Sequence, residues 1–449
     1  MLKVGLRVAQ LRRRDGWTRA QILEHQARAL RRLRNYVYAH SPFYRDFHKG
    51  LMDRPLEELP ILTKPVMMDN FDKLVTNPSI RLDPVEAFLA NAAGDAKFLD
   101  RYVVSSTSGT TGRRAIVLSD SLEWSIYIAS LARPMGWAGL APARRRRTAH
   151  VVSTVPWSMS ARVGASLSSP ISLSIRIDTH EPVDSIVRRL NEWRPQLLAS
   201  YASMGGVLAG EQLAGRLRIQ PEIIITAAEV LTDDLRARIE AAWGKILFNL
   251  YSATESMLAA ECEVHSGLHL FDDLGIFEVV DERGQPVPAG EYGERLLVTS
   301  LFRRTQPLIR YEISDMVRLA KEPCPCNRPF RLIDGIQGRI EEVLRFPAAA
   351  GGEVAIDPIF FEPILGSIRA SAWQLIQEPD GLRVMFAGLP PAFDAEALAL
   401  TLRRELATKG AIVRAIKVIP VESIPRSASG KAPLIKAMPG ALAYDHTND

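Results

Sequence analysis

A loop rich in hydroxyl side chains and glycine lies near residue 110. It reads Ser105-Ser106-Thr107-Ser108-Gly109-Thr110-Thr111-Gly112-Arg113-Arg114. Glycines let backbone N–H groups approach an anion, hydroxyl groups add donors, and arginines add positive charge, which together are the chemistry of a polyphosphate site. The segment lacks the P-loop consensus G-x-x-x-x-G-K-[ST], so by itself it is equally well an ordinary polar surface loop.

Acidic side chains follow two neighbouring predicted strands. Glu255 ends the segment Tyr251-Ser252-Ala253-Thr254-Glu255, directly after a predicted strand over residues 246–251, and Glu229 follows the strand before it. Ligands of open α/β sheets bind beyond the carboxyl ends of the strands. A carboxylate there can hold nucleotide-bound Mg²⁺, and Thr254 can donate to a phosphate. The structural alternative is a helix N-cap at Thr254.

Three later segments also carry polar groups that could act on a nucleotide. They are Arg310-Tyr311-Glu312-Ile313-Ser314-Asp315, Gly338-Arg339-Ile340-Glu341-Glu342, and Ile424-Pro425-Arg426-Ser427-Ala428-Ser429-Gly430-Lys431. The carboxylate of Asp315 suits a pair of ribose hydroxyls, although a plain turn aspartate is the simpler interpretation. Lys431 lies on a loop from which it could enter a site on another domain and neutralise developing charge, or it is an ordinary surface lysine.

The three cysteines of the chain lie close to these segments. Cys262 follows Glu255 and precedes His265 and His269, and Cys324-Pro325-Cys326 follows Asp315. Three thiols and one histidine form a complete tetrahedral Zn²⁺ set, with no position left for water. The alternative is three unrelated buried thiols. We favour a structural zinc held by Cys262, Cys324, Cys326 and His269, with His265 as the other candidate histidine.

Five polar segments follow one another along the chain, over residues 105–114, 251–255, 310–315, 338–342 and 424–431. In type and order they resemble the motifs of the adenylate-forming superfamily of acyl-CoA synthetases, peptide-synthetase adenylation domains and luciferases. The chain is most similar to the phenylacetate–CoA ligase group. Two N-terminal stretches are also typical of that group, namely His40-Ser41-Pro42-Phe43-Tyr44-Arg45 and Leu59-Pro60-Ile61-Leu62-Thr63-Lys64. The resemblance therefore extends over almost the whole chain.

The resemblance implies a role for each candidate residue. The ATP phosphates would be bound by Ser108, Gly109, Thr110, Thr111 and Gly112. The rest of the nucleotide and its Mg²⁺ would be contacted by Glu229 and Tyr251 (adenine), Thr254 (α-phosphate), Glu255 (Mg²⁺), Asp315 (ribose) and Arg339. Lys431 would stabilise the adenylation transition state, and Glu341 would be the hinge residue. The catalytic residues would be Lys431, Glu255 and Thr254.

The implied reaction is the ATP-dependent activation of an aromatic or otherwise apolar carboxylic acid to acyl-AMP. The second step expected is transfer to coenzyme A, with transfer to a carrier protein or an amine as the alternative. Residues 345–353 lack the glycine–asparagine stretch usual in thioester-forming ligases, so the acceptor stays open. A nucleotide-binding module without activity is a further alternative, but Lys431, Glu255 and Asp315 are all retained. Trp157 and Tyr201 are candidates for an acyl pocket or for the core.

The composition is that of a globular enzyme. The 449 residues carry a net charge of +5, with 47% hydrophobic and 24% charged residues. A mild positive excess fits an anionic small molecule better than a nucleic acid. No apolar run reaches the length of a membrane span, and three cysteines cannot build a disulfide scaffold. We expect a cytoplasmic protein with neither nucleic acid nor membrane as a partner; a homodimer is one option.

The elements that must position these residues alternate between strand and helix. Residues 182–251 show this alternation with short loops, which predicts a parallel sheet within an α/β fold. A helix is predicted over 18–39, inside a helical N-terminal segment, 1–75. We expect a large AMP-binding domain over 1–338, with layered mixed sheets and helices. A small, mobile α+β lid is expected over 339–449.

Overall fold

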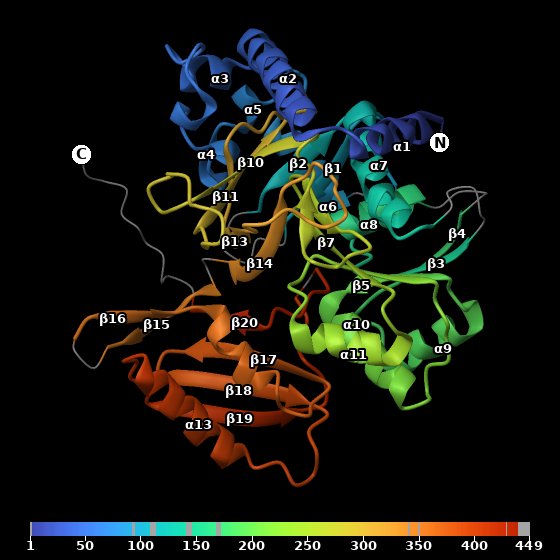
Figure 1. Cartoon of the computed structure of the whole chain (residues 1–449), viewed down its shortest axis with the longest axis vertical. Helices are drawn as coiled ribbons and strands as arrows, with labels where there is room; N and C mark the ends of the chain where they lie inside the picture. Colours follow the sequence, from blue (N-terminus) through green and yellow to red (C-terminus); the bar gives the residue numbers. More distant parts are fainter. Residues whose placement is uncertain are drawn as a thin grey trace.

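A computed structural model of the chain describes residues 2–91, 95–107, 114–140, 146–167, 172–339, 342–348, 351–427 and 429–438. Within these residues the largest element is a nine-stranded mixed sheet with the order β13-β14-β9-β8-β7-β6-β5-β3-β4. Helices lie on both faces of this sheet (Figure 1). The prediction of an α/β fold with layered mixed sheets is therefore confirmed.

Five neighbouring strands of this sheet are parallel. They are β3 (Arg146–Val151), β4 (Ser172–Ile177), β5 (Leu197–Tyr201), β6 (Ile223–Ala227) and β7 (Leu247–Ser252). The connecting helices are α8 (Met159–Leu167), α9 (Val183–Trp193), α10 (Ala202–Leu213) and α11 (Asp233–Trp243). The elements predicted over residues 182–251 are all present, with ends shifted by a few residues at most.

Strand β6 shows why this sheet is covered on both faces. Ile224 packs with Leu198 and Ile239 in one apolar cluster, whereas Ile223 and Ile225 pack in a second cluster on the other face. Successive side chains of a strand point to opposite faces, so a run of three isoleucines needs apolar cover on both. Helices α9, α10 and α11 provide one cover, and α7 (Ser121–Trp137) contributes to the other.

The other half of the large sheet is antiparallel and belongs to later parts of the chain. It consists of β8 (Met257–Glu261), β9 (Leu268–Leu270), β13 (Asp315–Leu319) and β14 (Leu332–Arg339). Beside it lie a three-stranded sheet of β10 (Gly275–Val280), β11 (Arg295–Ser300) and β12 (Tyr311–Ile313), and the hairpin of β1 (Val103–Ser106) and β2 (Ile116–Ser119).

The N-terminal segment is helical, as predicted. It contains α1 (Leu2–Asp15), α2 (Arg19–His40), α3 (Pro42–Phe47), a 3₁₀ turn over Leu56–Glu58, α4 (Lys64–Asp69), α5 (Phe71–Leu74) and, just beyond residue 75, α6 (Leu82–Asn91). Helix α2 begins after a capping box in which Thr18 and Gln21 satisfy each other's backbone N–H groups. The sequence predicts a helix individually over 18–39, whereas α1 is predicted only as part of the helical segment over 1–75.

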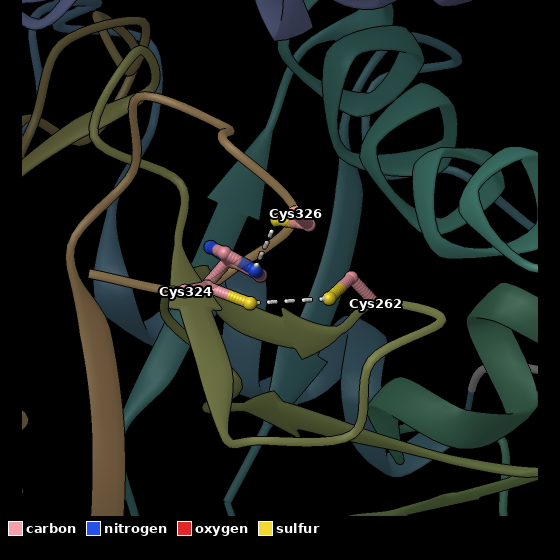
Figure 2. Close-up of side chains that lie close together, drawn as sticks. Cys262, Cys324 and Cys326 are labelled. Carbon is pink, nitrogen blue, oxygen red and sulfur yellow. Dashed lines mark hydrogen bonds between the residues drawn. The ribbon is translucent and has the colours of Figure 1, made fainter. Parts of the chain in front are cut away.

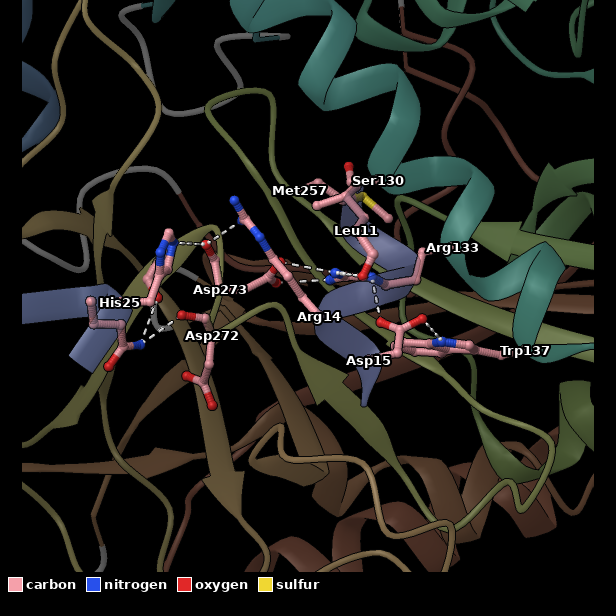
Figure 3. Close-up of polar contacts among 12 residues, drawn as sticks. Leu11, Arg14, Asp15, His25, Ser130, Arg133, Trp137, Met257, Asp272 and Asp273 are labelled. Atoms are coloured by element: carbon pink, nitrogen blue, oxygen red, sulfur yellow. Dashed lines mark hydrogen bonds and ion pairs between the residues drawn. The ribbon is translucent and has the colours of Figure 1, made fainter. Parts of the chain in front are cut away.

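A buried ion pair anchors α1 to the large sheet (Figure 3). Arg133 of α7 donates to both oxygens of Asp273 at 2.8 and 2.9 Å, and Arg14 donates to Asp273 at 3.3 Å. Arg133 also lies 3.0 Å from the Asp15 carboxylate at the end of α1. Burial alone would raise the pKa of Asp273, but the two arginines outweigh burial and the pKa is lowered. The guanidinium groups of Arg133 and Arg14 therefore neutralise the buried Asp273 carboxylate.

The elements after β14 form separate sheets with their own apolar core. They are β15 (Leu344–Pro347), β16 (Glu353–Ile356), a 3₁₀ turn over Pro358–Phe360, α12 (Glu362–Leu365), β17 (Ala372–Glu378), β18 (Gly381–Ala387), α13 (Ala395–Thr408), β19 (Ala415–Val421) and β20 (Ile435–Lys436). We call residues 342–438 the C-terminal lobe and the rest the large lobe. The two lobes lie one below the other in Figure 1. The predicted domain boundary at 338/339 stays a prediction.

The helices described in the structure include none long and apolar enough to cross a membrane.

Candidate active site

The carboxyl ends of the parallel strands are where the predicted nucleotide residues meet. Tyr251 of β7 donates a hydrogen bond from its phenol to Asp315 Oδ2 at 2.6 Å. The register of β13 and β14 sets Asp315 opposite Arg339, and the Arg339 guanidinium donates to Asp315 Oδ1 at 3.2 Å. Burial, reinforced by the Asp315 charge, raises the pKa of Tyr251 well above its usual range, so its phenol remains a donor. Three strands thus orient one carboxylate.

Glu255 lies in the turn between β7 and β8. Its Oε1 accepts a hydrogen bond from the Tyr311 phenol of β12 at 2.8 Å, and the turn is closed by a 2.9 Å bond from the Ala253 N–H to the Ser256 carbonyl. Thr254 is half-buried in the same turn. The alternative of a helix N-cap at Thr254 is wrong, because a strand follows this turn and not a helix.

Lys431 reaches the same place from the C-terminal lobe. Burial lowers the pKa of Lys431 and the Arg339 charge lowers it further, whereas the carboxylates of Glu229, Asp315 and Glu255 act in the opposite direction. The backbone on either side of Lys431 is hydrogen-bonded to Thr179 and Glu229 at the strand ends. Lys431 is therefore held at the edge of the sheet where Glu229, the residue predicted to contact the adenine, lies.

Glu229 follows β6 and uses both of its carboxylate oxygens on backbone groups. One oxygen accepts from the Ser203 N–H at the start of α10, and the other accepts from the Ala432 N–H, each at 2.8 Å. Ala432 is the residue after Lys431. The predicted role of Glu229 beside an adenine stays a prediction.

Several predicted residues lie outside the described part of the chain. These are Ser108, Gly109, Thr110, Thr111 and Gly112 of the predicted phosphate loop, and Glu341, the predicted hinge. The residues next to the phosphate segment are described. Thr107 and Ala115 exchange hydrogen bonds, with the Thr107 N–H donating to the Ala115 carbonyl and the Ala115 N–H donating to Thr107 Oγ1, both at 2.9 Å. Thr107 and Ala115, which flank the predicted phosphate segment, therefore lie next to each other.

The three cysteines and His269 form a compact cluster (Figure 2). The four ligand atoms lie within 4.8 Å of one another. Cys262 Sγ is 3.7 Å from Cys324 Sγ, and Cys326 Sγ is 3.3 Å from His269 Nε2. A tetrahedral zinc with Zn–S bonds of about 2.3 Å separates its sulfur atoms by about 3.8 Å. The chemistry and spacing of these donors therefore fit Zn²⁺.

Of the two candidate histidines, His269 is the one in the cluster. It lies in β9, and its Nδ1 is 3.4 Å from the Phe330 carbonyl, a contact that leaves Nε2 toward the thiols. His265 lies with its Nδ1 3.5 Å from Glu261, outside the cluster. The approach of β9 to β14 needs Gly267, because a Cβ there would lie 2.5 Å from the Ile333 carbonyl oxygen and its φ is +145°.

Some residues of the site were not assigned from the sequence. No sequence pattern assigns a role to Tyr311, which holds Glu255, or to Thr179, which contacts the backbone beside Lys431. Tyr201, a candidate for the acyl pocket or the core, donates to the Ser429 carbonyl at 3.1 Å. The one available signal was position, since Thr179 and Tyr201 both lie at the carboxyl ends of strands.

Several known proteins with related sequences or structures are CoA ligases. A scan against protein-family models finds no match. A phenylacetate-coenzyme A ligase of Thermus thermophilus is 25% identical over 337 residues, which cover 71% of this chain and 70% of that protein. A phenylacetate-coenzyme A ligase of Escherichia coli is 25% identical over 349 residues, 72% of this chain and 73% of that protein. Among solved structures, 2-hydroxyisobutyryl-CoA ligase in the postadenylation state with R3-HIB-AMP has a TM-score of 0.70 at 20% identity, covering 91% of this chain and 88% of that one.

Proposed function

We propose that the chain, which is similar to phenylacetate-coenzyme A ligases, is an adenylate-forming ligase that activates a carboxylic acid with ATP and transfers the acyl group to coenzyme A. The first step yields acyl-AMP and pyrophosphate, and the second yields an acyl-CoA thioester and AMP. The acid we propose is aromatic or otherwise apolar. This substrate class follows from the resemblance to phenylacetate–CoA ligases.

One observation carries this proposal, namely that the backbone on both sides of Lys431 is hydrogen-bonded to the strand ends, through Thr179 before it and Glu229 after it. A carboxylate attacks the α-phosphorus of ATP only if the negative charge on the transferring group is stabilised. A cation that the C-terminal lobe brings to this edge of the sheet can provide that stabilisation. Burial and the charge of Arg339 lower the pKa of Lys431, which is not expected of an ordinary exposed lysine.

The proposed roles follow from the hydrogen bonds already described. Asp315, oriented by Tyr251 and Arg339, would accept the ribose hydroxyls. Glu255, held by Tyr311, would hold Mg²⁺ through its carboxylate, and oxygen ligands of this kind suit that ion. When bound, Mg²⁺ supplies charge neutralisation to the phosphates. The carboxylate oxygen of the substrate forms the new bond to the α-phosphorus, and the bond to pyrophosphate breaks.

The test is a pyrophosphate-release screen over aromatic and aliphatic carboxylic acids, run with and without coenzyme A. We expect acid-dependent release and, with coenzyme A, an acyl-CoA product. Release without a thioester product would move the proposal to a carrier protein or an amine as acceptor. If no acid in the panel supports release or ATP–pyrophosphate exchange, the chain is a nucleotide-binding module and the proposal is wrong.

We also propose that Cys262, His269, Cys324 and Cys326 hold one structural Zn²⁺. The spacing of their ligand atoms supports this, as does their closed set of four donors. The ion would join β8 and β9 to the loop between β13 and β14, next to the strands that carry Asp315 and Arg339. Elemental analysis of freshly purified protein should give one zinc per chain, and its absence would reject the site.

A further inference from the structure

The segment around Lys431 is attached to the large lobe through its backbone. Among the described residues, backbone groups of this segment make four such contacts: Tyr201 Oη donates to the Ser429 carbonyl at 3.1 Å, Thr179 Oγ1 donates to the Gly430 carbonyl at 3.1 Å, the Ala432 N–H donates to Glu229 at 2.8 Å, and His180 Nε2 lies 3.1 Å from the Ser427 carbonyl. The Arg426 side chain adds a bond of 3.3 Å to Ser203 Oγ. The large-lobe groups come from residues that follow β4, β5 and β6 or end them. The segment therefore lies on the edge of the sheet where the nucleotide residues meet.

These bonds bracket Lys431 in the chain. The carbonyls of the two preceding residues, Ser429 and Gly430, are held by Tyr201 and Thr179, and the N–H of the residue that follows is held by Glu229. The backbone of Lys431 is thus positioned from both sides. The charges of Arg339, Glu229, Asp315 and Glu255 act on the amine of the lysine placed in this way.

Gly430 fits this surface because it has no side chain. Its φ is +75°, and a Cβ at this position would lie 2.3 Å from Thr179 Oγ1, 3.3 Å from Ser153 Cβ and 3.4 Å from Tyr201 Cε2. Any other residue would both strain the backbone and push the segment away from the large lobe. Gly430 is therefore matched to the attached position of the segment.

Glu229 is directed at the segment by an unusual backbone conformation. The residue before it, Ala228, has a φ of +68°. A residue other than glycine is strained in this region and persists there only where the surroundings require it. Here it turns the chain after β6 so that the Glu229 carboxylate spans Ser203 and Ala432.

The attachment is also built to be reversible. Tyr201 Oη accepts from the Ser153 N–H at 3.1 Å and lies 2.9 Å from Ser160 Oγ. Glu229 keeps its bond to the Ser203 N–H in the large lobe. Both groups therefore have partners whether or not the segment is attached, and separation leaves few polar groups unsatisfied.

We propose that Thr179, Tyr201 and Glu229 form a latch that positions Lys431 for acyl-AMP formation and is not needed for thioester formation. They are positioning residues, since they act on the backbone beside Lys431. This inference rests on the proposed function, because it assigns the three residues to the first of its two steps.

The test measures the two half-reactions separately in Thr179→Val and Tyr201→Phe, which keep side-chain shape and remove one hydroxyl each. The rate of pyrophosphate release should fall about three- to tenfold, as for the loss of one hydrogen bond, with an unchanged rate of transfer from synthetic acyl-AMP to coenzyme A. Equal losses in both half-reactions, or none, would overturn the latch.

Matched controls separate positioning from folding. Thr76→Val removes a hydroxyl that donates to the Arg304 carbonyl at 2.8 Å, and Tyr44→Phe removes a buried phenol that donates to the Pro307 carbonyl at 2.9 Å. Both sites lie in the large lobe away from the Lys431 segment. These variants should affect stability without changing the ratio of the two half-reaction rates. A changed ratio would show that general destabilisation produces the same signature.

Two substitutions that change the steric contact between residues 430 and 179 test the latch most directly. Gly430→Ala should slow pyrophosphate release roughly 30-fold or more, through backbone strain and overlap with Thr179 Oγ1. Adding Thr179→Ala removes the overlapping atom, so the double variant should be faster than Gly430→Ala alone, although Thr179→Ala by itself is slower than the wild type. Additive losses would contradict direct contact between the two positions.

Hydrogen exchange of the full chain keeps this inference separate from the proposed function. The peptide over residues 424–438 should take up deuterium faster in Thr179→Val and Tyr201→Phe than in the wild type, with no substrate present. Faster exchange without acid-dependent pyrophosphate release from the wild type would leave the attachment intact and reject the enzyme proposal. Normal release with unchanged exchange and unchanged half-reactions would reject the latch alone.

Discussion

The cysteine cluster and the Lys431 site both join distant parts of the chain, but they are built from different contacts. The cluster lies within the large lobe, in an apolar group that includes Phe271 and Phe330. The Lys431 site joins two lobes through single hydrogen bonds to backbone groups. A closed, apolar site suits a contact that persists, whereas a polar site at the edge of a sheet suits a contact that forms and separates.

This difference predicts how the protein responds to substitutions in each region. Loss of the cluster should weaken the whole protein and affect every activity alike. Loss of a group in the Lys431 site should alter one half-reaction and leave stability unchanged. Two variants and one pH profile test this contrast.

The largest effect is expected from Cys324→Ser combined with Cys326→Ser. This double variant should lose its zinc and more than about 4 kcal/mol of unfolding free energy, because metal binding energy is folding energy. Elemental analysis and urea denaturation measure both quantities. His265→Gln is the matched control, since His265 lies outside the cluster and its loss should leave the zinc in place. Retained stability in the metal-free double variant would remove the contrast between the two regions.

A smaller but more selective effect is expected from Lys431→Ala. Acyl-AMP formation should fall by about 10²- to 10³-fold, as for loss of one group that stabilises transition-state charge. Transfer from synthetic acyl-AMP and the thermal midpoint should not change. Lys436→Ala, five positions further along the same segment, should leave both half-reactions as in the wild type. If the two half-reactions fall together in Lys431→Ala, the lysine serves the fold and not the first step.

The smallest effect is expected in the pH dependence of acyl-AMP formation. Burial lowers the pKa of Lys431 below its ordinary value of 10.5, and the Arg339 charge lowers it further. The protonated amine is the form that acts, so kcat/KM for ATP should fall as the pH rises through a value below 10.5. The rate of transfer from acyl-AMP should not show this loss at alkaline pH. In Lys431→Arg the loss should occur at a higher pH, since a guanidinium stays charged. If the loss occurs at the same pH in this variant, it belongs to another group.

Local sequence patterns predicted much of the fold. Helix α9 and strand β5 have the bounds that the sequence predicts, 183–193 and 197–201, because an amphipathic repeat and a short apolar run between polar turns are signals carried by neighbouring residues. The sequence does not mark helix α1 individually, and its end is held by ion pairs of Asp15 with Arg133 and of Arg14 with Asp273, which are contacts between distant segments. The sequence predicts a strand over 411–418, whereas β19 begins at Ala415, where it pairs with Gly381 at the start of β18.

The types and order of the polar segments are local properties of the sequence, and they predict nucleotide, acid and zinc chemistry. Which of these groups meet depends on the tertiary structure. The register of β13 against β14 sets Asp315 opposite Arg339, and β9 directs His269 at the thiols while the turn before it holds His265 away. Glu229, expected beside an adenine, holds the backbone after Lys431. Strand register and the approach of two lobes depend on the packing of the whole chain, so no local pattern could specify these contacts.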